Sequence, residues 1–389
     1  MSSRSDNALQ AAAIYPIEGD FMPPRSVMIK PASSSCNLRC RYCFYADEAA
    51  VRGVANYGIM RDTTLETLIS KFLSSAQGSC SFVFQGGEPT LAGLDFFKKV
   101  VLFERKYNTK NLKIFNALQT NGMVLEDEWC AFLANNHFLV GLSLDGVKDT
   151  HDLCRVTPDL AGTYSRVLHA VQILEKHHVE FNILTVVTAQ LAKNITKVYG
   201  FYKKNHFLYQ QYIPCMDALG YARGQNSYSL TPRMYGDFLN SLFDLWYQDL
   251  CRGLYVSIRY FDNLLRILNR QAPESCSMTG QCNIQYLAEA DGSVYPCDFY
   301  ALDQYQLGNV LDNSIEELDQ RRTQLRFIED SLQKPEECHV CRWFALCRGG
   351  CRRDCIDGAG SKNYYCESYQ LFFEHALPRL KQATAMIAR

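Results

Sequence analysis

The sequence lacks the features that would place a chain in a membrane, in a secretory pathway or on nucleic acid. No stretch of its 389 residues approaches ~18 uninterrupted apolar residues, which excludes a transmembrane helix. The N-terminal segment has only a short apolar patch at 9–14 and no apolar core of a secretory signal. With 40 basic and 41 acidic residues, the net charge of −1 gives no reason to expect nucleic acid or an anionic membrane as a partner. We therefore expect a cytoplasmic protein.

Internal repeats and low-complexity tracts are also absent, whereas cysteine is in excess. The length, about 2.6 times a typical ~150-residue domain, predicts one large domain and one smaller one. The chain has 17 cysteines, although a chain of this size buries a core without disulfides. Disulfides are disfavoured in the expected reducing compartment, so metal or cluster ligation is the better explanation.

Strand-like and helix-like segments alternate through the first part of the chain. Six β-then-α units favour a parallel sheet with right-handed crossovers. The units are short, which favours an α/β fold of the open or closed (β/α) barrel type, with chemistry at the C-terminal ends of the strands. The predicted strands are 26–30, 81–84, 112–118, 138–144, 179–187 and 207–213. The predicted helices are 62–76, 93–107, 126–136, 163–178 and 190–205.

The pattern changes after about residue 230, which predicts the domain organisation. A helical stretch leads into a cysteine-rich region, where an Asp291-Gly292 turn predicts a hairpin between 284–289 and 293–295. The predicted parts are an N-terminal extension (1–22), a partial (β/α)6 barrel (23–230), a helical linker (231–270) and a loop-rich domain with a C-terminal helix (271–389).

Three cysteines, Cys36, Cys40 and Cys43, follow the first predicted strand with spacing x3 and then x2. Thiolates are the usual ligands of iron–sulfur clusters, and three ligands on a four-iron cluster leave one iron open to an exogenous ligand. The alternative is a zinc site, which would need a nearby fourth ligand. The nearest histidine is His137, far along the sequence.

This Cys-x3-Cys-x2-Cys motif, with Tyr42 before the last cysteine, resembles the radical S-adenosylmethionine (SAM) superfamily. The second strand ends in Gln85-Gly86-Gly87-Glu88-Pro89, which resembles the Gly-Gly-Glu-Pro motif of that superfamily. Glycines allow a ligand to approach the backbone, and a carboxylate can bind an ammonium group. The resemblance implies that SAM chelates the open iron. The implied SAM contacts are Gln85, Gly86, Gly87, Glu88, Ser143, Arg155 and Met216.

Nine further cysteines lie between Cys276 and Cys366. A zinc ribbon would use four of them and leave five unexplained, whereas eight would ligate two cubane clusters. The region resembles the SPASM domain of radical SAM enzymes, which implies two auxiliary 4Fe–4S clusters. By that resemblance the first auxiliary ligands are Cys276, Cys282, Cys297 and Cys351, and the second are Cys338, Cys341, Cys347 and Cys366. Cys355 is left without an assigned role.

Four segments resemble the anaerobic sulfatase-maturating enzymes, across about residues 23–383. They are Cys43-Phe44-Tyr45, 84–93, 257–262 and 295–300. The family oxidises a Cys or Ser in a sulfatase Cys/Ser-x-Pro/Ala-x-Arg motif to Cα-formylglycine. The implied route is hydrogen abstraction from the substrate Cβ by a 5′-deoxyadenosyl radical, followed by loss of a proton and an electron.

The resemblance also implies roles for individual residues and partners. Asp298 matches the proton acceptor, because a positioned carboxylate can take the proton. Asp262 is an alternative acceptor, and Tyr45 matches an active-site tyrosine. The implied partners are a sulfatase polypeptide, unfolded or nascent, and an electron donor such as flavodoxin or ferredoxin.

Two other functions compete with this interpretation. One is a SPASM maturase that makes thioether or carbon–carbon crosslinks in a ribosomal peptide; about 22 residues precede the barrel, fewer than the ~80-residue peptide-binding domain often found there. The other is a non-catalytic iron–sulfur carrier or zinc-binding module, which the three-cysteine motif and the Gly-Gly-Glu-Pro motif argue against. The sequence leaves open whether the target residue is Cys or Ser.

Overall fold

The computed structural model describes residues 25–218 and 222–387, so the predicted extension 1–22 lies outside the described residues. The strands are β1 (Arg25–Ile29), β2 (Ser79–Phe84), β3 (Lys113–Thr120), β4 (Leu139–Ser143), β5 (Phe181–Val187), β6 (Tyr209–Pro214), β7 (Ser257–Ile258), β8 (Leu287–Ala288), β9 (Ser293–Tyr295) and β10 (Gly308–Asn309). They form one sheet in the order β10-β9-β8-β1-β2-β3-β4-β5-β6-β7.

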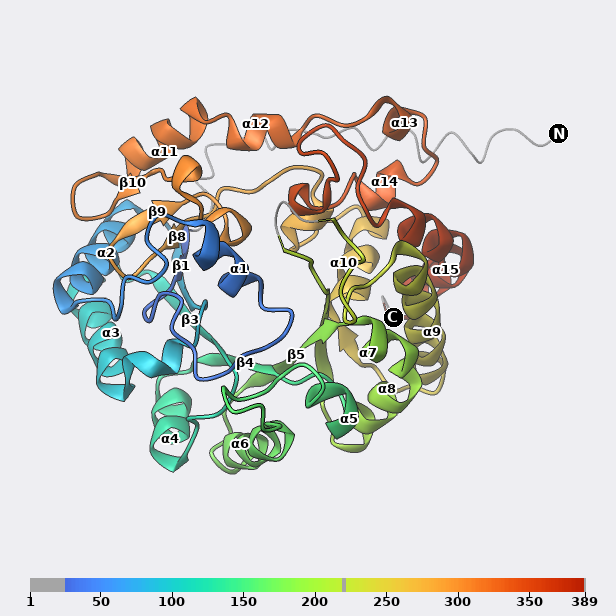
Figure 1. Cartoon of the computed structure of the whole chain (residues 1–389), viewed down its shortest axis with the longest axis horizontal. Coiled ribbons are helices and arrows are strands. Elements are labelled where there is room, and N and C mark those ends of the chain that lie inside the picture. Colours follow the sequence, from blue (N-terminus) through green and yellow to red (C-terminus); the bar gives the residue numbers. More distant parts are fainter. Residues whose placement is uncertain (1–24, 219–221, 388–389) are drawn as a thin grey trace.

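Strands β1 to β6 are neighbours in chain order and all parallel, as the alternating pattern predicts. The sheet curves into an incomplete ring with helices outside it (Figure 1). It stays open in its strand order, with β10 and β7 at its two ends. The predicted partial barrel is therefore confirmed.

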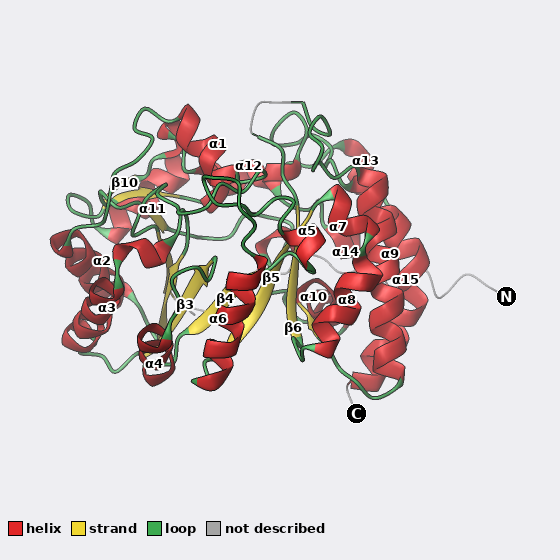
Figure 2. Ribbon diagram, turned by 60° about the horizontal axis from the view of Figure 1, so that its bottom comes forward, coloured by secondary structure: helices red, strands yellow, loops and turns green. Residues whose placement is uncertain are grey.

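The helices that cover the sheet have the apolar spacing expected of one buried face. In α2 (Asp62–Ser75), for example, Leu65, Leu68, Ile69 and Phe72 are buried. The other helices of the barrel are α1 (Phe44–Val51), α3 (Leu94–Tyr107), α4 (Asp127–Asn135), α5 (Lys148–His151), α6 (Tyr164–Lys176), α7 (Ala189–Lys193) and α8 (Ile195–Lys204). Figure 2 shows helices outside the strands and loops gathered beyond one end of them.

Helix α1 was not among the predicted helices. Its one fully buried side chain is Glu48, so it has no apolar stripe that could reveal it. It is held instead by contacts outside the barrel, such as Phe44 against Phe299 with ring centroids 5.1 Å apart. The single helix predicted at 190–205 is divided into α7 and α8 at Asn194.

The C-terminal part begins with α9 (Pro232–Cys251), which packs against the last helix, α15 (Cys366–Ile387). Between them lie α10 (Arg259–Leu268), α11 (Ile315–Gln324), α12 (Phe327–Ser331), α13 (Glu336–His339) and α14 (Phe344–Cys347). No helix of residues 25–218 and 222–387 is long and apolar enough to cross a membrane.

The predicted hairpin is confirmed and is built into the edge of the barrel. Strands β8 and β9 are antiparallel, and β8 pairs in parallel with β1, Ile29 opposite Ala288. The amide of Lys30 donates to the carbonyl of Ala288 at 2.9 Å. The hairpin therefore holds the C-terminal region beside the first barrel strand, where the cysteine loop begins.

Candidate active site

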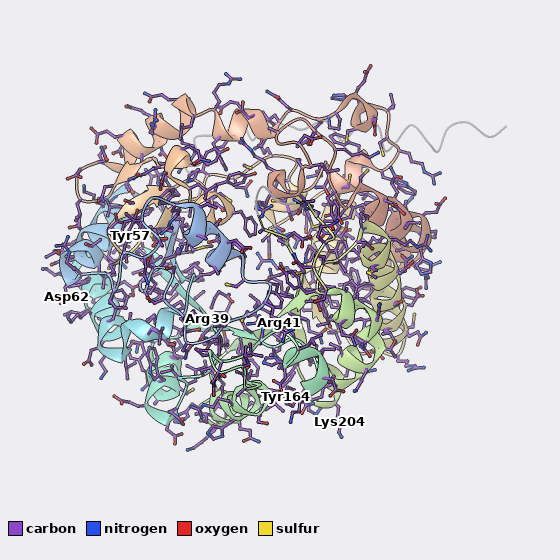
Figure 3. All side chains as sticks on the ribbon, viewed as in Figure 1. Arg39, Arg41, Tyr57, Asp62, Tyr164 and Lys204 are labelled. Carbon is purple, nitrogen blue, oxygen red and sulfur yellow. The ribbon has the colours of Figure 1, made fainter. Side chains whose placement is uncertain are left out.

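The first three cysteines lie on one loop at the C-terminal end of β1. The loop is fixed by its backbone: the amide of Arg39 donates to Val156 at 2.7 Å and that of Arg41 to Cys154 at 3.0 Å. Arg39 and Arg41 lie near the middle of the ring, whereas Asp62, Tyr164 and Lys204 lie toward its rim (Figure 3).

The loop brings these three thiols close together. The pKa of Cys36 is raised to about 11 and that of Cys40 to about 12, mainly by burial and in smaller part by the neighbouring Cys43 thiol. At neutral pH such thiols are protonated, so thiolate ligation requires a cation that displaces the protons. This clustered donor set fits a metal centre.

Behind the loop lies a buried set of polar side chains, Tyr42, Asp145 and Arg155. The Asp145 carboxylate accepts from the Tyr42 hydroxyl and from Nε of Arg155, the latter at 3.0 Å. Nη1 of Arg155 lies 3.9 Å from Sγ of Cys40. The structure thus places Arg155 directly beside the cysteine loop, as expected for a residue near the SAM site.

The Gly-Gly-Glu-Pro turn follows β2 and lies against the same loop. Gly87 has a φ of 56°, and a Cβ there would lie 2.4 Å from the carbonyl oxygen of Ser35. Only glycine fits this close approach. The Glu88 carboxylate accepts from Thr90 and Thr120 at one oxygen and from the amide of Asn121 at the other. Glu88 is thus already bonded to the protein, and its predicted contact with an ammonium group stays a prediction.

The remaining predicted SAM contacts also lie at the C-terminal end of the sheet. Ser143 is the last residue of β4 and is half-buried. Met216 follows β6, which ends at Pro214, and is half-buried as well. Both face the end of the ring at which chemistry is expected, and their SAM contacts stay predictions.

Asp298 is part of a hydrogen-bonded cluster with Tyr45 and Gln85. The Tyr45 hydroxyl donates to Oδ2 of Asp298 at 2.7 Å. Nε2 of Gln85 donates to the Tyr45 hydroxyl oxygen at 2.6 Å and to Oδ2 of Asp298 at 3.1 Å. These residues come from α1, the end of β2 and the short 3₁₀ helix Asp298–Tyr300. Gln85 is therefore an orienting partner of the predicted proton acceptor, and its predicted contact with SAM stays a prediction.

The other oxygen of this carboxylate is not held by the described residues. Oδ1 of Asp298 is buried and has no hydrogen-bond partner among the described residues. Burial raises the pKa of Asp298 to about 6, so the group is mainly ionised at neutral pH. Glu48 is buried nearby, and burial raises its pKa to about 8. The alternative acceptor, Asp262, accepts instead from Tyr255 and Ser257, both at 2.6 Å.

The four thiols predicted for the first auxiliary site also come together. Burial raises the pKa of Cys297 well above its usual range, and the nearby Cys351 and Cys276 thiols raise it further. Burial likewise raises the pKa of Cys351, with added effects of Cys276 and Cys282. Cys297 directly precedes Asp298, so this group of thiols adjoins the Tyr45–Gln85–Asp298 cluster.

The second auxiliary group is assembled in the same way nearer the surface. Burial raises the pKa of Cys347 to about 12, and Cys341, Cys338 and Cys366 raise it further. Cys355 has no place in the predicted division of the cysteines, and its thiol donates to the carbonyl of Cys351 at 3.8 Å.

The three groups consist of thiols alone, which are the donors that iron–sulfur clusters take. Across residues 25–218 and 222–387, no three His, Cys, Asp or Glu side chains converge on a point that one metal ion could occupy. A cubane cluster is larger than an ion, so its ligand sulfurs stand further apart. The all-thiol donor sets suit iron–sulfur clusters.

Sequence reasoning missed three buried charges beneath the Asp298 cluster, Lys30, Arg52 and Glu289. Nζ of Lys30 and Nη1 of Arg52 each lie 2.5 Å from Oε1 of Glu289. A lysine at the end of an apolar strand and a glutamate at the end of a hairpin strand were the available signals. Lys30 and Glu289 meet only because β1 pairs with β8, and the sequence pattern did not predict that pairing.

Comparisons with known proteins agree with this geometry. A model of the radical SAM superfamily matches residues 31–195, and a model of the SPASM iron-sulfur cluster-binding domain matches residues 276–342. The chain is 51% identical over 362 residues to the cysteine-type anaerobic sulfatase-maturating enzyme of Clostridium perfringens, covering 92% of this chain and 98% of that relative. The chain belongs to the anaerobic sulfatase-maturating enzymes. The radical SAM and SPASM assignments are therefore confirmed.

Other relatives of this family show the same coverage. The cysteine-type enzyme of Clostridium novyi is 43% identical, over 94% of this chain and 99% of the relative. The serine-type enzyme of Bacteroides thetaiotaomicron is 30% identical, over 92% and 91%. The solved structure "Native anSMEcpe with bound AdoMet and Cp18Cys peptide" superposes with a TM-score of 0.90 at 49% identity, covering 94% of this chain and 100% of that one. This anaerobic sulfatase-maturating enzyme thus shares its whole fold with a peptide-binding relative.

Proposed function

We propose that this enzyme oxidises a cysteine in a sulfatase Cys-x-Pro-x-Arg motif to Cα-formylglycine. The observation that carries the proposal is the position of Asp298: a buried carboxylate with one free oxygen, oriented by Tyr45 and Gln85 and adjoining a group of four thiols. A cysteine target is favoured over serine because identity is 51% and 43% to two cysteine-type relatives and 30% to a serine-type one.

The thiol groups provide sites for three 4Fe–4S clusters. We assign Cys36, Cys40 and Cys43 to the cluster that holds SAM. The first auxiliary cluster is assigned to Cys276, Cys282, Cys297 and Cys351, and the second to Cys338, Cys341, Cys347 and Cys366. Bound there, SAM supplies the 5′-deoxyadenosyl radical that removes one hydrogen atom from the substrate Cβ, and the auxiliary clusters supply an electron acceptor.

The residues of the chain then complete the oxidation. After one hydrogen atom has left Cβ, the carbon radical must lose one electron and the proton of the thiol to become a thioaldehyde, and water then replaces the sulfur, which leaves as sulfide. The second Cβ hydrogen stays in the aldehyde. Asp298 takes the thiol proton through its free Oδ1. Tyr45 and Gln85 hold Oδ2 and so fix the direction of Oδ1. Gly86 and Gly87 leave room for SAM, with Ser143, Arg155 and Met216 as further contacts.

The proposed partners follow from this chemistry. The substrate is a sulfatase polypeptide, unfolded or nascent, because the target side chain must enter a buried site. An electron donor such as flavodoxin or ferredoxin would reduce the first cluster. We propose a cytoplasmic location, because thiol groups of this kind stay reduced there.

The test is anaerobic incubation of the reconstituted enzyme with SAM, dithionite and a Cys-x-Pro-x-Arg peptide, followed by mass spectrometry. We expect equal amounts of 5′-deoxyadenosine and peptide aldehyde. A peptide carrying a new crosslink instead of an aldehyde would indicate the alternative SPASM chemistry. Absence of 5′-deoxyadenosine would contradict radical chemistry altogether. A matched Ser-x-Pro-x-Arg peptide tests the preference for cysteine.

A further inference from the structure

Three buried charged side chains lie beneath the Tyr45–Gln85–Asp298 cluster. Lys30 is 1% exposed, Arg52 7% and Glu289 0%. Both cations bind the same carboxylate oxygen, Oε1 of Glu289, at 2.5 Å. The set joins the end of β1, the residue after α1 and the end of β8, and so connects the barrel to the hairpin region that carries Asp298.

Two cations on one carboxylate are more than charge pairing requires. A buried ion pair contributes little net stability, because the loss of hydration offsets the attraction between the charges. A second buried cation adds a further cost of desolvation and has no carboxylate of its own in this set. Either pair alone would satisfy Glu289, and Lys30 also lies close enough to the Asp298 carboxylate to interact with it electrostatically.

The two cations differ in the aromatic ring that each one faces. Nζ of Lys30 lies 5.2 Å from the centroid of the Tyr45 ring. The Arg52 guanidinium lies 5.3 Å from the centroid of the Tyr57 ring. A cation over a ring face is attracted by the ring and restrains its position. Lys30 therefore acts on the ring whose hydroxyl binds Asp298, and Arg52 does not.

The stem of Lys30 contacts a second part of the same cluster. A Cβ on Gly86 would lie 2.5 Å from Cγ, 2.8 Å from Cδ and 2.7 Å from Cε of Lys30, so the stem fills the space beneath the turn. Gln85, the residue before Gly86, donates to both Tyr45 and Asp298. One side chain thus supports both groups that orient the carboxylate.

We infer that Lys30 is a positioning residue: held on Glu289, it fixes the Tyr45 ring and the Gln85 turn so that Asp298 faces the substrate thiol. This inference rests on the proposed function. It predicts that loss of the ammonium group loosens Asp298 while SAM binding and cleavage continue. Arg52 serves as a matched control, because it binds the same oxygen of the same carboxylate as Lys30 does.

The test compares Lys30→Met with Arg52→Met. Each variant removes one cation and leaves one complete pair with Glu289, so both keep the same buried charge. We expect Lys30→Met to lower the aldehyde formed per 5′-deoxyadenosine about ten-fold, because small misplacement of a reacting group is costly. Arg52→Met should keep the wild-type ratio. Equal ratios in the two variants would overturn the inference, as would a loss of 5′-deoxyadenosine in Lys30→Met that matches the loss of aldehyde.

A double-mutant cycle with Tyr45→Phe gives an independent measurement. Phenylalanine keeps the ring but loses the hydroxyl bond to Asp298, so Lys30 can no longer act on Asp298 through that bond. The support of the Gln85 turn remains, so Lys30→Met should cause a smaller further loss in the Tyr45→Phe background than in the wild-type enzyme. Fully additive losses would show that Lys30 does not act through Tyr45 and would overturn the inference. A wild-type enzyme that makes 5′-deoxyadenosine without aldehyde would contradict the proposed function itself. That result is seen without any mutation, so it can be told apart from failure of the inference about Lys30.

Discussion

The first cysteine group and the auxiliary groups are held by different means. Cys36, Cys40 and Cys43 share one loop whose backbone is bonded to the barrel. The auxiliary groups join distant segments, as where Cys276 and Cys351 meet, and the elements around them are short. From this difference we predict that the barrel positions its thiols by itself, whereas the C-terminal region needs ligation to keep its thiols together. The predictions below test this contrast.

The largest effect is expected from Cys40→Ala. Loss of one of three ligands on the first loop should abolish 5′-deoxyadenosine formation, because SAM would have no cluster to bind. The loop backbone remains bonded to the barrel, so the melting temperature should change little. The measured iron content should fall from about twelve to about eight atoms per chain. Sustained SAM cleavage by this variant would remove these cysteines from the SAM site.

Cys351→Ala, in the first auxiliary group, should separate SAM cleavage from aldehyde formation. SAM cleavage should continue, since the first loop is untouched. Aldehyde formation should fall about 10²-fold, because both the electron acceptor and the position of Asp298 are disturbed. Chromatography of 5′-deoxyadenosine and mass spectrometry of the peptide measure both in one reaction. Parallel loss of the two products would contradict the separation of roles.

Iron removal tests the contrast in stability. An anaerobic chelator should increase hydrogen exchange most strongly between 276 and 366, where thiol groups connect short elements. Strands β2 to β5 should stay protected, because their hydrogen bonds and apolar core do not depend on metal. Equal loss of protection in both regions would show that the barrel too requires its cluster.

Cys355→Ser should have the smallest effect. Cys355 lies outside both auxiliary groups, so the iron content should not change. The free energy of unfolding should change by less than about 1 kcal/mol, as for a partly exposed polar replacement. A loss of about four irons would instead make Cys355 a ligand and require a different division of the cysteines.

Local patterns in the sequence predicted much of this molecule. Apolar runs predicted six parallel strands, and the Asp291-Gly292 turn predicted the hairpin, because both depend on neighbouring residues. Helix α1 escaped prediction since its contacts come from a distant segment, as with Phe44 and Phe299.

The same distinction between local patterns and contacts of distant segments applies to the site. The three cysteine groups could be predicted, because thiol spacing carries information by itself. The bond between Gln85 and Asp298 was not predicted from the sequence, and the Lys30–Glu289 pair was not expected at all. Both depend on the pairing of β8 with β1, which brings residues together that are far apart in the chain.

The central claim is that Asp298 takes the proton from the substrate after SAM has been cleaved. The most direct measurement is the ratio of aldehyde to 5′-deoxyadenosine for Asp298→Asn, with Asp262→Asn as the matched control. We predict that Asp298→Asn still forms 5′-deoxyadenosine while its aldehyde yield falls about 10²-fold, and that Asp262→Asn keeps the wild-type ratio. A wild-type ratio for Asp298→Asn would contradict the account. A fall in aldehyde yield in Asp262→Asn but not in Asp298→Asn would contradict it as well.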